Sequence, residues 1–198
     1  MMVKPQALGE YETMRLQKLS LDQVKLIYNE RMLFDFPDDE RKPLNMIVKA
    51  LSQGSYECLG LFDDQHLVGY AFLVKDENDY LVDYLAVYPE HRNKGIGGEL
   101  LHLLEESLRD ADNIIIEVED PDAAAEDAEK ETRIRRKSFY MRNGCQDTGL
   151  KVECFGVIYL ILTLGSTSCG NLLDLYLSFY RKMLPKAMFE KNVRGIEG

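Results

Sequence analysis

The sequence predicts a mixed α/β (α+β) fold, and the order of its segments leads to this prediction. β-favouring runs at 56–62, 67–75 and 80–88 follow one another at hairpin spacing, which favours an antiparallel meander. A glycine-rich turn, a helical stripe of leucines and another apolar run at 113–118 come next. Because a strand–helix–strand order is typical of a parallel pair, the sheet is expected to be mixed.

Composition indicates an ordinary globular protein. The chain has 198 residues, of which 45% are hydrophobic and 29% charged, enough for one domain over 1–198 with a sizeable core. A net charge of −10 argues against binding to nucleic acid or to an anionic membrane, and it is compatible with a cationic substrate. The longest apolar run, 157–164, is too short to span a bilayer. We therefore expect neither a nucleic-acid nor a membrane partner.

The cysteines and histidines give no metal-binding pattern. Cys58, Cys145, Cys154 and Cys169 form no Cys-x-x-Cys pair, and the chain has 3 histidines, so no metal is expected. The sequence shows no signal-peptide pattern, which favours a cytoplasmic, reducing compartment in which the four thiols stay free.

The first part of the chain is expected to supply a strand at 11–16 and two helices. Ser20 and Gln23 have the spacing of a capping box, so a helix should begin directly after Ser20. The second helix should start near Pro43 and end at Gly54, since glycine suits the left-handed position that stops a helix.

The predicted connection between these helices, 32–40, combines aromatic and acidic side chains. Phe34, Asp35 and Phe36 could together hold an amine or another cation, because aromatic faces and carboxylates both attract positive charge. The alternative is a loop whose aromatic side chains pack into the core and whose acids face water.

The second half is expected to supply a long helix and a hairpin. Acids gather at the start of 123–143 and bases at its end, which suits a helix dipole, and Gly144 should end that helix. Strands at 150–153 and 157–164 should then pair through a turn that contains Gly156.

The end of the chain, 165–198, is predicted as an extra helix and tail beyond a core of about 11–164. Pro185 should stop or bend this helix. Such an apolar stripe most often docks on its own domain, and a homodimer contact is the next interpretation. The stripe consists of Leu172, Leu173, Tyr176, Phe179, Tyr180 and Met183.

The glycine-rich turn is the strongest functional signal. The run 80–88 ends at Pro89, and 92–98 reads Arg-Asn-Lys-Gly-Ile-Gly-Gly before the leucine stripe. First-turn N–H groups have no partner inside a helix, the dipole adds positive charge there, and glycine lets a ligand approach. Together with two bases, this predicts a phosphate cradle.

Three other interpretations of this turn differ in the glycines or neighbours that they need. The glycines could simply make a tight strand-to-helix turn. A dinucleotide-binding fingerprint would need a third glycine where Leu100 stands. A nucleotide P-loop would need Gly-Lys-Ser or Gly-Lys-Thr, and neither tripeptide occurs in the sequence.

Two motifs resemble the GNAT N-acetyltransferase superfamily. Leu85-Ala86-Val87-Tyr88-Pro89 followed by Arg92-x-x-Gly95-x-Gly97 is similar to its pyrophosphate loop, and Phe139-Tyr140-x-x-x-Gly144-Cys145 to its Phe-Tyr-x-x-x-Gly-Phe signature. The match covers about 56–164 well and the first two helices only by pattern. Cys145 replaces an aromatic residue, and the acidic stretch 121–131 is longer than usual; it could extend the helix or form a lid.

The resemblance implies a GNAT-like sheet of about seven strands, mostly antiparallel, with helices on both faces. Its central parallel strands would splay apart to admit the pantetheine arm of acetyl-CoA, the implied cosubstrate. The implied cofactor-binding residues are Leu85, Ala86, Val87, Arg92, Asn93, Lys94, Gly95, Ile96, Gly97 and Gly98. The backbone N–H near Val87 would meet the oxyanion.

The resemblance also implies catalytic roles. Tyr140 would donate a proton to the leaving thiolate, the alternative being an ordinary core tyrosine. Glu117 would assist deprotonation of the amine through water, and a carboxylate in an apolar strand is costly unless solvated or paired. Asp83, on the central strand, competes for that role, and either carboxylate could instead face outward.

The expected activity is therefore direct acetyl transfer from acetyl-CoA to a primary amine without a metal. A small cationic amine is preferred, with the acceptor site expected at Phe34, Asp35 and Phe36. A peptide N-terminus, a protein lysine and longer acyl donors remain open. The alternative from another class is a non-catalytic acyl-CoA-binding sensor or interaction module.

Overall fold

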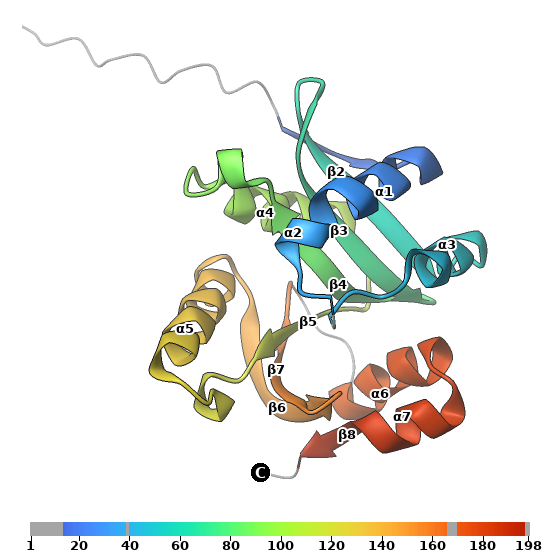
Figure 1. Ribbon diagram of the computed structural model, residues 1–198, viewed down its shortest axis with the longest axis vertical. Coiled ribbons are helices and arrows are strands. Elements are labelled where there is room, and N and C mark those ends of the chain that lie inside the picture. The colour runs from blue at the N-terminus through green and yellow to red at the C-terminus, as the bar shows by residue number, and fades with distance from the viewer. Residues whose placement is uncertain (1–13, 39, 166–169, 197–198) are drawn as a thin grey trace, which may run out of the picture.

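The computed structural model describes residues 14–38, 40–165 and 170–196, and eight strands within these ranges form one sheet. They are β1 Arg15–Lys18, β2 Tyr56–Asp63, β3 His66–Asp76, β4 Asp79–Val87, β5 Asn113–Glu119, β6 Gln146–Cys154, β7 Val157–Thr163 and β8 Val193–Ile196. Their order across the sheet is β1-β2-β3-β4-β5-β7-β6-β8 (Figure 1). The neighbours β4 and β5 are parallel and the other neighbouring pairs antiparallel, which confirms the predicted mixed sheet with one strand more than expected.

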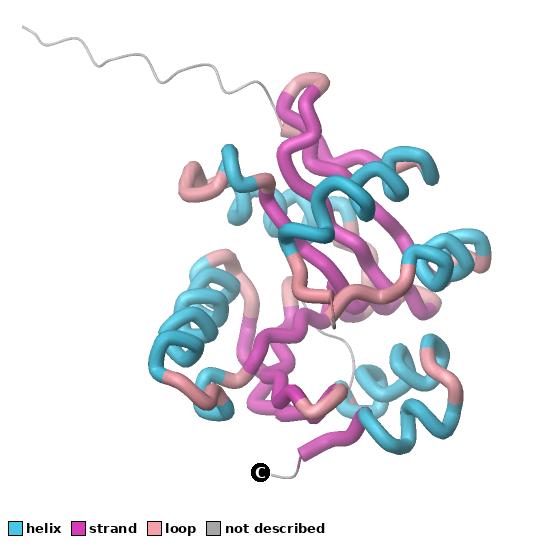
Figure 2. The backbone as a smooth tube through the Cα atoms, in the orientation of Figure 1, coloured by secondary structure: helices cyan, strands magenta, loops and turns pink. Residues whose placement is uncertain are grey.

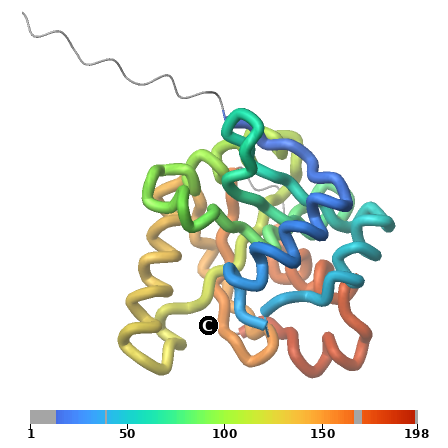
Figure 3. Tube along the Cα trace, turned by 45° about the horizontal axis from the view of Figure 1, so that its top comes forward, coloured from blue at the N-terminus to red at the C-terminus, as the bar shows by residue number. Residues whose placement is uncertain are grey.

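Helices cover both faces of this sheet, as predicted (Figure 2). One face carries α1 (Leu21–Ile27), a π-helical turn (Tyr28–Met32), α2 (Leu33–Asp35), α3 (Leu44–Ser52), α6 (Leu172–Met183) and α7 (Lys186–Asn192). The other face carries α4 (Ile96–Ser107) and α5 (Asp127–Arg142). Figure 3 shows α5 at one side of the molecule and the α6–α7 pair at the other, with the sheet between them.

Local signals placed several of these boundaries correctly. The Ser20 N–H donates to Gln23 Oε1 at 2.8 Å, and the Gln23 N–H donates to Ser20 Oγ at 3.3 Å, so the predicted capping box begins α1. Gly54 and Gly144 have φ of +73° and +92° and follow α3 and α5 as the predicted stops. The turn between β6 and β7 contains Gly156, also as predicted.

The acidic stretch before α5 becomes part of the helical layer. Residues Pro121–Ala123 form a separate 3₁₀ turn, and α5 starts at Asp127 rather than at 123 as predicted. Arg133 of α5 is buried and donates to the Asp120 carbonyl at 2.9 Å and to Glu129 Oε1 at 2.6 Å. Of the stretch 121–131, only Asp127 to Glu131 extend the helix, as the first turns of α5, and 121–126 precede it.

The C-terminal segment docks on its own domain, as the apolar stripe predicted. Tyr176 and Phe179 of α6 are fully buried in the core. Beyond α7, β8 pairs with β6 from Cys154↔Val193 to Lys151↔Ile196, an edge strand that the sequence did not predict. The strand predicted at 11–16 overlaps β1 only at residues 15 and 16, because β1 runs from Arg15 to Lys18. Residues 11–13 of the prediction lie outside the described residues, as does Cys169. Within the described ranges, no helix has the length and apolar character needed to cross a membrane.

The parallel pair opens in the middle of the sheet. Pairing between β4 and β5 runs from Asp79↔Asn113 to Val82↔Ile116 and stops there, so the strands splay as the resemblance implied. At the same level the β3–β4 register skips one residue: Leu73 faces Val82 and Phe72 faces Tyr84, which leaves Asp83 as a bulge. A bulge bends its strand, and here the bend falls where the splay begins.

Candidate active site

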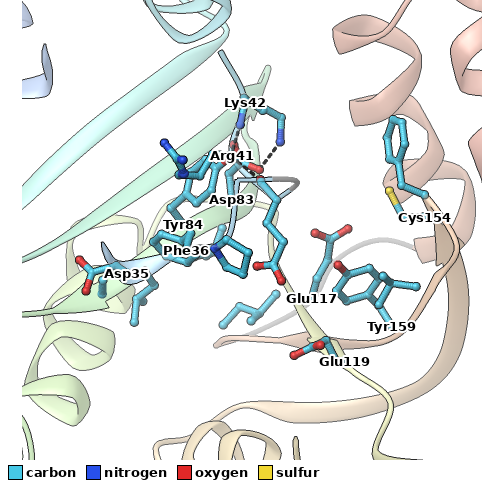
Figure 4. Close-up of a pocket in the computed structure, with 18 of the residues that line it drawn as sticks. Asp35, Phe36, Arg41, Lys42, Asp83, Tyr84, Glu117, Glu119, Cys154 and Tyr159 are labelled. Carbon is cyan, nitrogen blue, oxygen red and sulfur yellow. Dashed lines mark hydrogen bonds and ion pairs between the residues drawn. The ribbon is translucent and has the colours of Figure 1, made fainter. Parts of the chain in front are cut away.

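A cavity of about 1430 Å³ occupies the opening between β4 and β5. Its walls come from both strands, from α5 on one face of the sheet, and from the 35–46 segment and the α6–α7 region on the other (Figure 4). Pockets for a single small ligand are typically about 300–1,000 Å³. The cavity therefore has room for the arm of a large cofactor and a second substrate together.

Asp83 forms a buried ion pair at the rim of the opening. The Lys42 ammonium donates to Asp83 Oδ1 at 2.5 Å, and the Tyr56 hydroxyl donates to Oδ2. The Asp83 side chain is 4% exposed. Burial tends to lower the pKa of Lys42, but the adjacent Asp83 carboxylate outweighs it and the pKa is raised. Both Asp83 oxygens are thus engaged, one by Lys42 and the other by Tyr56.

Three further hydrogen bonds fix the segment that carries Lys42. Its backbone N–H donates to the Tyr84 hydroxyl at 2.7 Å, and its carbonyl accepts from the Tyr28 hydroxyl at 3.0 Å. The Tyr84 hydroxyl in turn donates to the Glu40 carbonyl at 2.9 Å. The 40–42 segment is therefore anchored to β4 and to the helical layer beside the cavity.

Glu117 lies on β5, on the other strand of the opening, and lines the cavity (Figure 4). The Tyr180 hydroxyl of α6 donates to Glu117 Oε1 at 2.8 Å. Burial raises the pKa of Glu117, while the hydroxyls of Tyr176 and Tyr180 and the charge of Lys42 oppose that rise. Because this partner is a neutral phenol rather than a cation, Glu117 fits the role of a general base better than Asp83 does.

Tyr140 lies near the end of α5 and lines the cavity from the opposite face of the sheet. Its ring packs edge-on against Phe139 at 5.1 Å between centroids, and Cys145 belongs to the same buried cluster. Burial raises the pKa of Tyr140 to about 12, with the Arg136 charge acting in the opposite direction. The phenol is therefore protonated at neutral pH and can donate a hydrogen bond into the cavity.

The glycine-rich turn joins β4 to α4 as predicted. Gly95 has φ +84° and precedes the first helical residue, Ile96, so its conformation favours glycine. Arg92 donates from Nε to the Val87 carbonyl at 2.8 Å and from Nη2 to Asp35 Oδ1 at 2.6 Å. Arg92 thus links this turn to the 35–46 wall of the cavity. Asn93, with φ +62°, precedes Lys94 in the turn.

Two of the predicted loop glycines have a packing role. A Cβ on Gly98 would lie 2.4 Å from Asn143 Oδ1, and a Cβ on Gly97 would lie 3.1 Å from the Phe139 ring. Asn143 is held there by a 2.7 Å hydrogen bond from its Nδ2 to the Phe139 carbonyl. Gly97 and Gly98 therefore allow α4 to lie close to the end of α5, and the ligand approach expected of them from the sequence stays a prediction.

The structure separates the three residues predicted for the acceptor site. Asp35 is 4% exposed in its side chain, accepts from the Tyr70 hydroxyl at 3.0 Å and lines the cavity. Phe36 also lines the cavity and packs edge-on against Tyr84 at 4.9 Å. Phe34 is 84% exposed and is not among the residues that line the cavity, so the structure does not bring it to the site.

Several cavity residues were not foreseen from the sequence. Lys42 lines the cavity and holds Asp83 together with the core residue Tyr56, while Tyr159 lies beside Glu117 (Figure 4). Tyr180 appeared in the sequence only as one member of an apolar stripe. No local pattern marks these side chains, because each reaches the cavity through pairing or packing of segments that are distant in the chain.

Comparison with known proteins identifies the class to which this site belongs. Residues 21–128 match the model of the Acetyltransferase (GNAT) family, which is more than half of the chain. The chain therefore belongs to the GNAT family and is an acetyl-CoA-dependent N-acetyltransferase. No curated protein sequence matches the chain.

Among the described residues, no three His, Cys, Asp or Glu side chains gather as a metal site would require.

Solved structures share the fold at low sequence identity. A GNAT-family acetyltransferase from Bacteroides thetaiotaomicron has 23% identity and a TM-score of 0.64, over 84% of this chain and 94% of that one. The ribosomal-protein-S18-alanine N-acetyltransferase from Escherichia coli has 18% identity and a TM-score of 0.56, over 80% and 97%. A Bacillus subtilis acetyltransferase in complex with CoA has 18% identity and a TM-score of 0.53, over 78% and 99%.

Proposed function

We propose that the protein transfers an acetyl group from acetyl-CoA directly to a small cationic primary amine, with Glu117 as the general base and Tyr140 as the proton donor. The observation that carries this proposal is the opening between β4 and β5. It is bordered by Glu117 on the face of α6 and by Tyr140 on the face of α5. A thioester and an amine that enter from the two faces would meet between these side chains.

The cofactor is proposed to bind along β4 and the glycine-rich turn. The pairing of β4 with β5 ends at Val82, so residues 85–87 have backbone groups on that edge that a pantetheine amide can pair with. The N-terminus of α4 offers backbone N–H groups to a diphosphate, and Arg92 and Lys94 add charge. The Arg92 side chain is about half exposed, which leaves it accessible to such a ligand.

The amine is proposed to lose its proton to Glu117, directly or through one water. An ammonium group cannot attack a thioester until it is deprotonated, and a carboxylate with a raised pKa is the better base. Glu117, Glu40 and Tyr159 all line the cavity, and burial followed by the charges of the two carboxylates raises the pKa of the Tyr159 hydroxyl. Two carboxylates in the cavity favour a cationic acceptor.

Tyr140 is proposed to stabilise the departing thiolate. With a pKa of about 12 the phenol is a weaker acid than a free thiol, whose pKa is about 8.5. It therefore acts chiefly as a hydrogen-bond donor to the thiolate. The proton that the thiolate finally keeps comes from the amine nitrogen, which loses a second proton as the amide forms, and Tyr140 stays neutral. The N–H of Val87, on the same strand edge, is the proposed donor to the oxyanion.

Thiol release and calorimetry with the Tyr140→Phe variant test this proposal. The wild type should release CoA thiol when acetyl-CoA and a primary amine are both present. Tyr140→Phe should bind CoA with unchanged affinity and lose roughly 10²-fold or more in kcat, the effect typical of a general acid or base. Equal turnover by the variant would exclude the role of Tyr140, and an absence of CoA binding by the wild type would exclude the whole proposal.

A further inference from the structure

The turn between β6 and β7 places an aromatic residue where the backbone disfavours it. Phe155 and Gly156 form a two-residue hairpin turn with φ of +50° and +82°. Turns with two positive φ values favour Asn-Gly, because asparagine and glycine tolerate the left-handed region. A bulky side chain there is strained, and such strain tends to occur at functional sites. Burial does not compensate, since Phe155 is 53% exposed.

Phe155 belongs to an apolar rim at one end of the cavity. We define the apolar rim as Phe155, Leu184, Pro185 and Met188, all of which line the cavity. Met188 of α7 is 45% exposed. The Phe155 N–H donates to the Asn192 carbonyl at 2.8 Å, which fastens the turn to the end of α7. The rim is thus a joint product of the β6–β7 turn and the C-terminal segment.

Polar groups lie deeper in the same part of the cavity. Cys154, directly before Phe155, also lines the cavity. Burial raises the pKa of its thiol, and the charge of Glu117 adds to that rise. Tyr159 and Tyr180 line the cavity beside Glu117. A molecule entering past the apolar rim therefore meets apolar surface first and a carboxylate next.

We infer that the acceptor is a compact monoamine with an apolar body about the size of an aromatic ring, whose amine reaches Glu117 while its body lies against the apolar rim. This inference rests on the proposed function. A diamine would place its second ammonium group on the rim, where it would lose water and gain no partner. The apolar body instead gains free energy by covering Phe155 and Met188.

The apolar rim lies outside the part of the chain that matches the family model. Its four residues lie beyond residue 128, where that match ends. Three of them, Leu184, Pro185 and Met188, belong to the segment that adds α6, α7 and β8 after the end of β7. The inference therefore rests on residues of this chain and not on the family match.

Initial rates with three acceptors test the inference: 2-phenylethylamine, putrescine and the dipeptide Gly-Gly, each with acetyl-CoA. The wild type should favour 2-phenylethylamine by about 10-fold or more in kcat/KM, the discrimination that an apolar contact provides. A preference for putrescine or Gly-Gly would overturn the inference and leave the proposed function standing. Release of no thiol with any amine would overturn both.

The Phe155→Asn variant separates a binding role from a structural one. It should raise KM for 2-phenylethylamine by about 10-fold and leave kcat nearly unchanged. Its melting temperature should stay equal or rise, because asparagine suits the turn. Met188→Gln should also raise KM, and Leu26→Gln, an exposed leucine of α1 away from the cavity, should not. An unchanged KM in both rim variants would overturn the inference.

Discussion

Tyr180 of α6 donates a 2.8 Å hydrogen bond to Glu117 of β5, across 63 residues of sequence. The C-terminal segment therefore does more than cover the core. It supplies the hydrogen bond that holds the proposed base at the opening between β4 and β5.

Removing this hydrogen bond should change the pH dependence of the reaction. Burial raises the pKa of Glu117 and the Tyr180 hydroxyl opposes that rise, so Tyr180→Phe should raise the pKa further. A base must be deprotonated to act, so the rising limb of kcat/KM against pH should move to higher pH by about one unit. Tyr176 packs against Tyr180 and its hydroxyl also lowers the pKa of Glu117, so Tyr176→Phe should move the limb in the same direction. A limb that stays in place in both variants would contradict this assignment.

Glu117→Gln should separate activity from stability. The variant keeps an oxygen for Tyr180 but loses the base, and kcat should fall by about 10²–10⁴-fold. A carboxyl whose pKa is raised by folding stabilises the protein below its unfolded pKa, and this contribution is lost as the pH rises through the folded pKa. The wild type should therefore lose melting temperature relative to Glu117→Gln between mildly acidic and mildly alkaline pH. If the melting temperature of the wild type rises relative to that of Glu117→Gln over this range, the pKa of Glu117 is not raised by folding.

The free energy of unfolding should fall more when one partner of the Lys42–Asp83 pair is replaced than when both are. Lys42→Met leaves a carboxylate that is 4% exposed without its cation, which should cost about 3–5 kcal/mol of unfolding free energy. Lys42→Met combined with Asp83→Leu should recover part of that loss. Urea unfolding of the two single variants and the double variant gives the coupling free energy. Additive losses would show that the two side chains do not depend on each other.

Gly98→Ala tests the packing role of the loop glycines. The new Cβ would meet Asn143 Oδ1 and force Asn143 away from the Phe139 carbonyl, at about 1–3 kcal/mol. Gly98→Ala with Asn143→Ala should be less destabilised than the sum of the single changes, because the clashing atom is gone. If the Gly98→Ala variant and the double variant unfold at the same denaturant concentration, Asn143 is not what restricts position 98.

The parts of the fold that follow from neighbouring residues were predictable. The capping box at Ser20 and the stops at Gly54 and Gly144 depend on a few consecutive residues, and the structure shows all three. The turn from β4 into α4 is likewise local, since Pro89 ends one element and Gly95 allows the next to begin.

The parts that depend on distant segments were not predictable. Phe34 shares its segment with Asp35, yet the helical turn directs one to solvent and the other to Arg92. The bulge at Asp83 depends on the register with β3, and β8 depends on a partner strand that lies two helices earlier in the chain. The packing of Gly97 and Gly98 against α5 was likewise not predicted, because their neighbours on α5 are distant in the chain.

The central claim is that acetyl-CoA and the amine occupy the opening between β4 and β5 at the same time and react directly. Initial rates measured over a grid of both substrate concentrations test it. Direct transfer in a ternary complex predicts double-reciprocal lines that intersect. Parallel lines would indicate that the acetyl group first passes to the enzyme, and they would contradict the roles proposed for Glu117 and Tyr140.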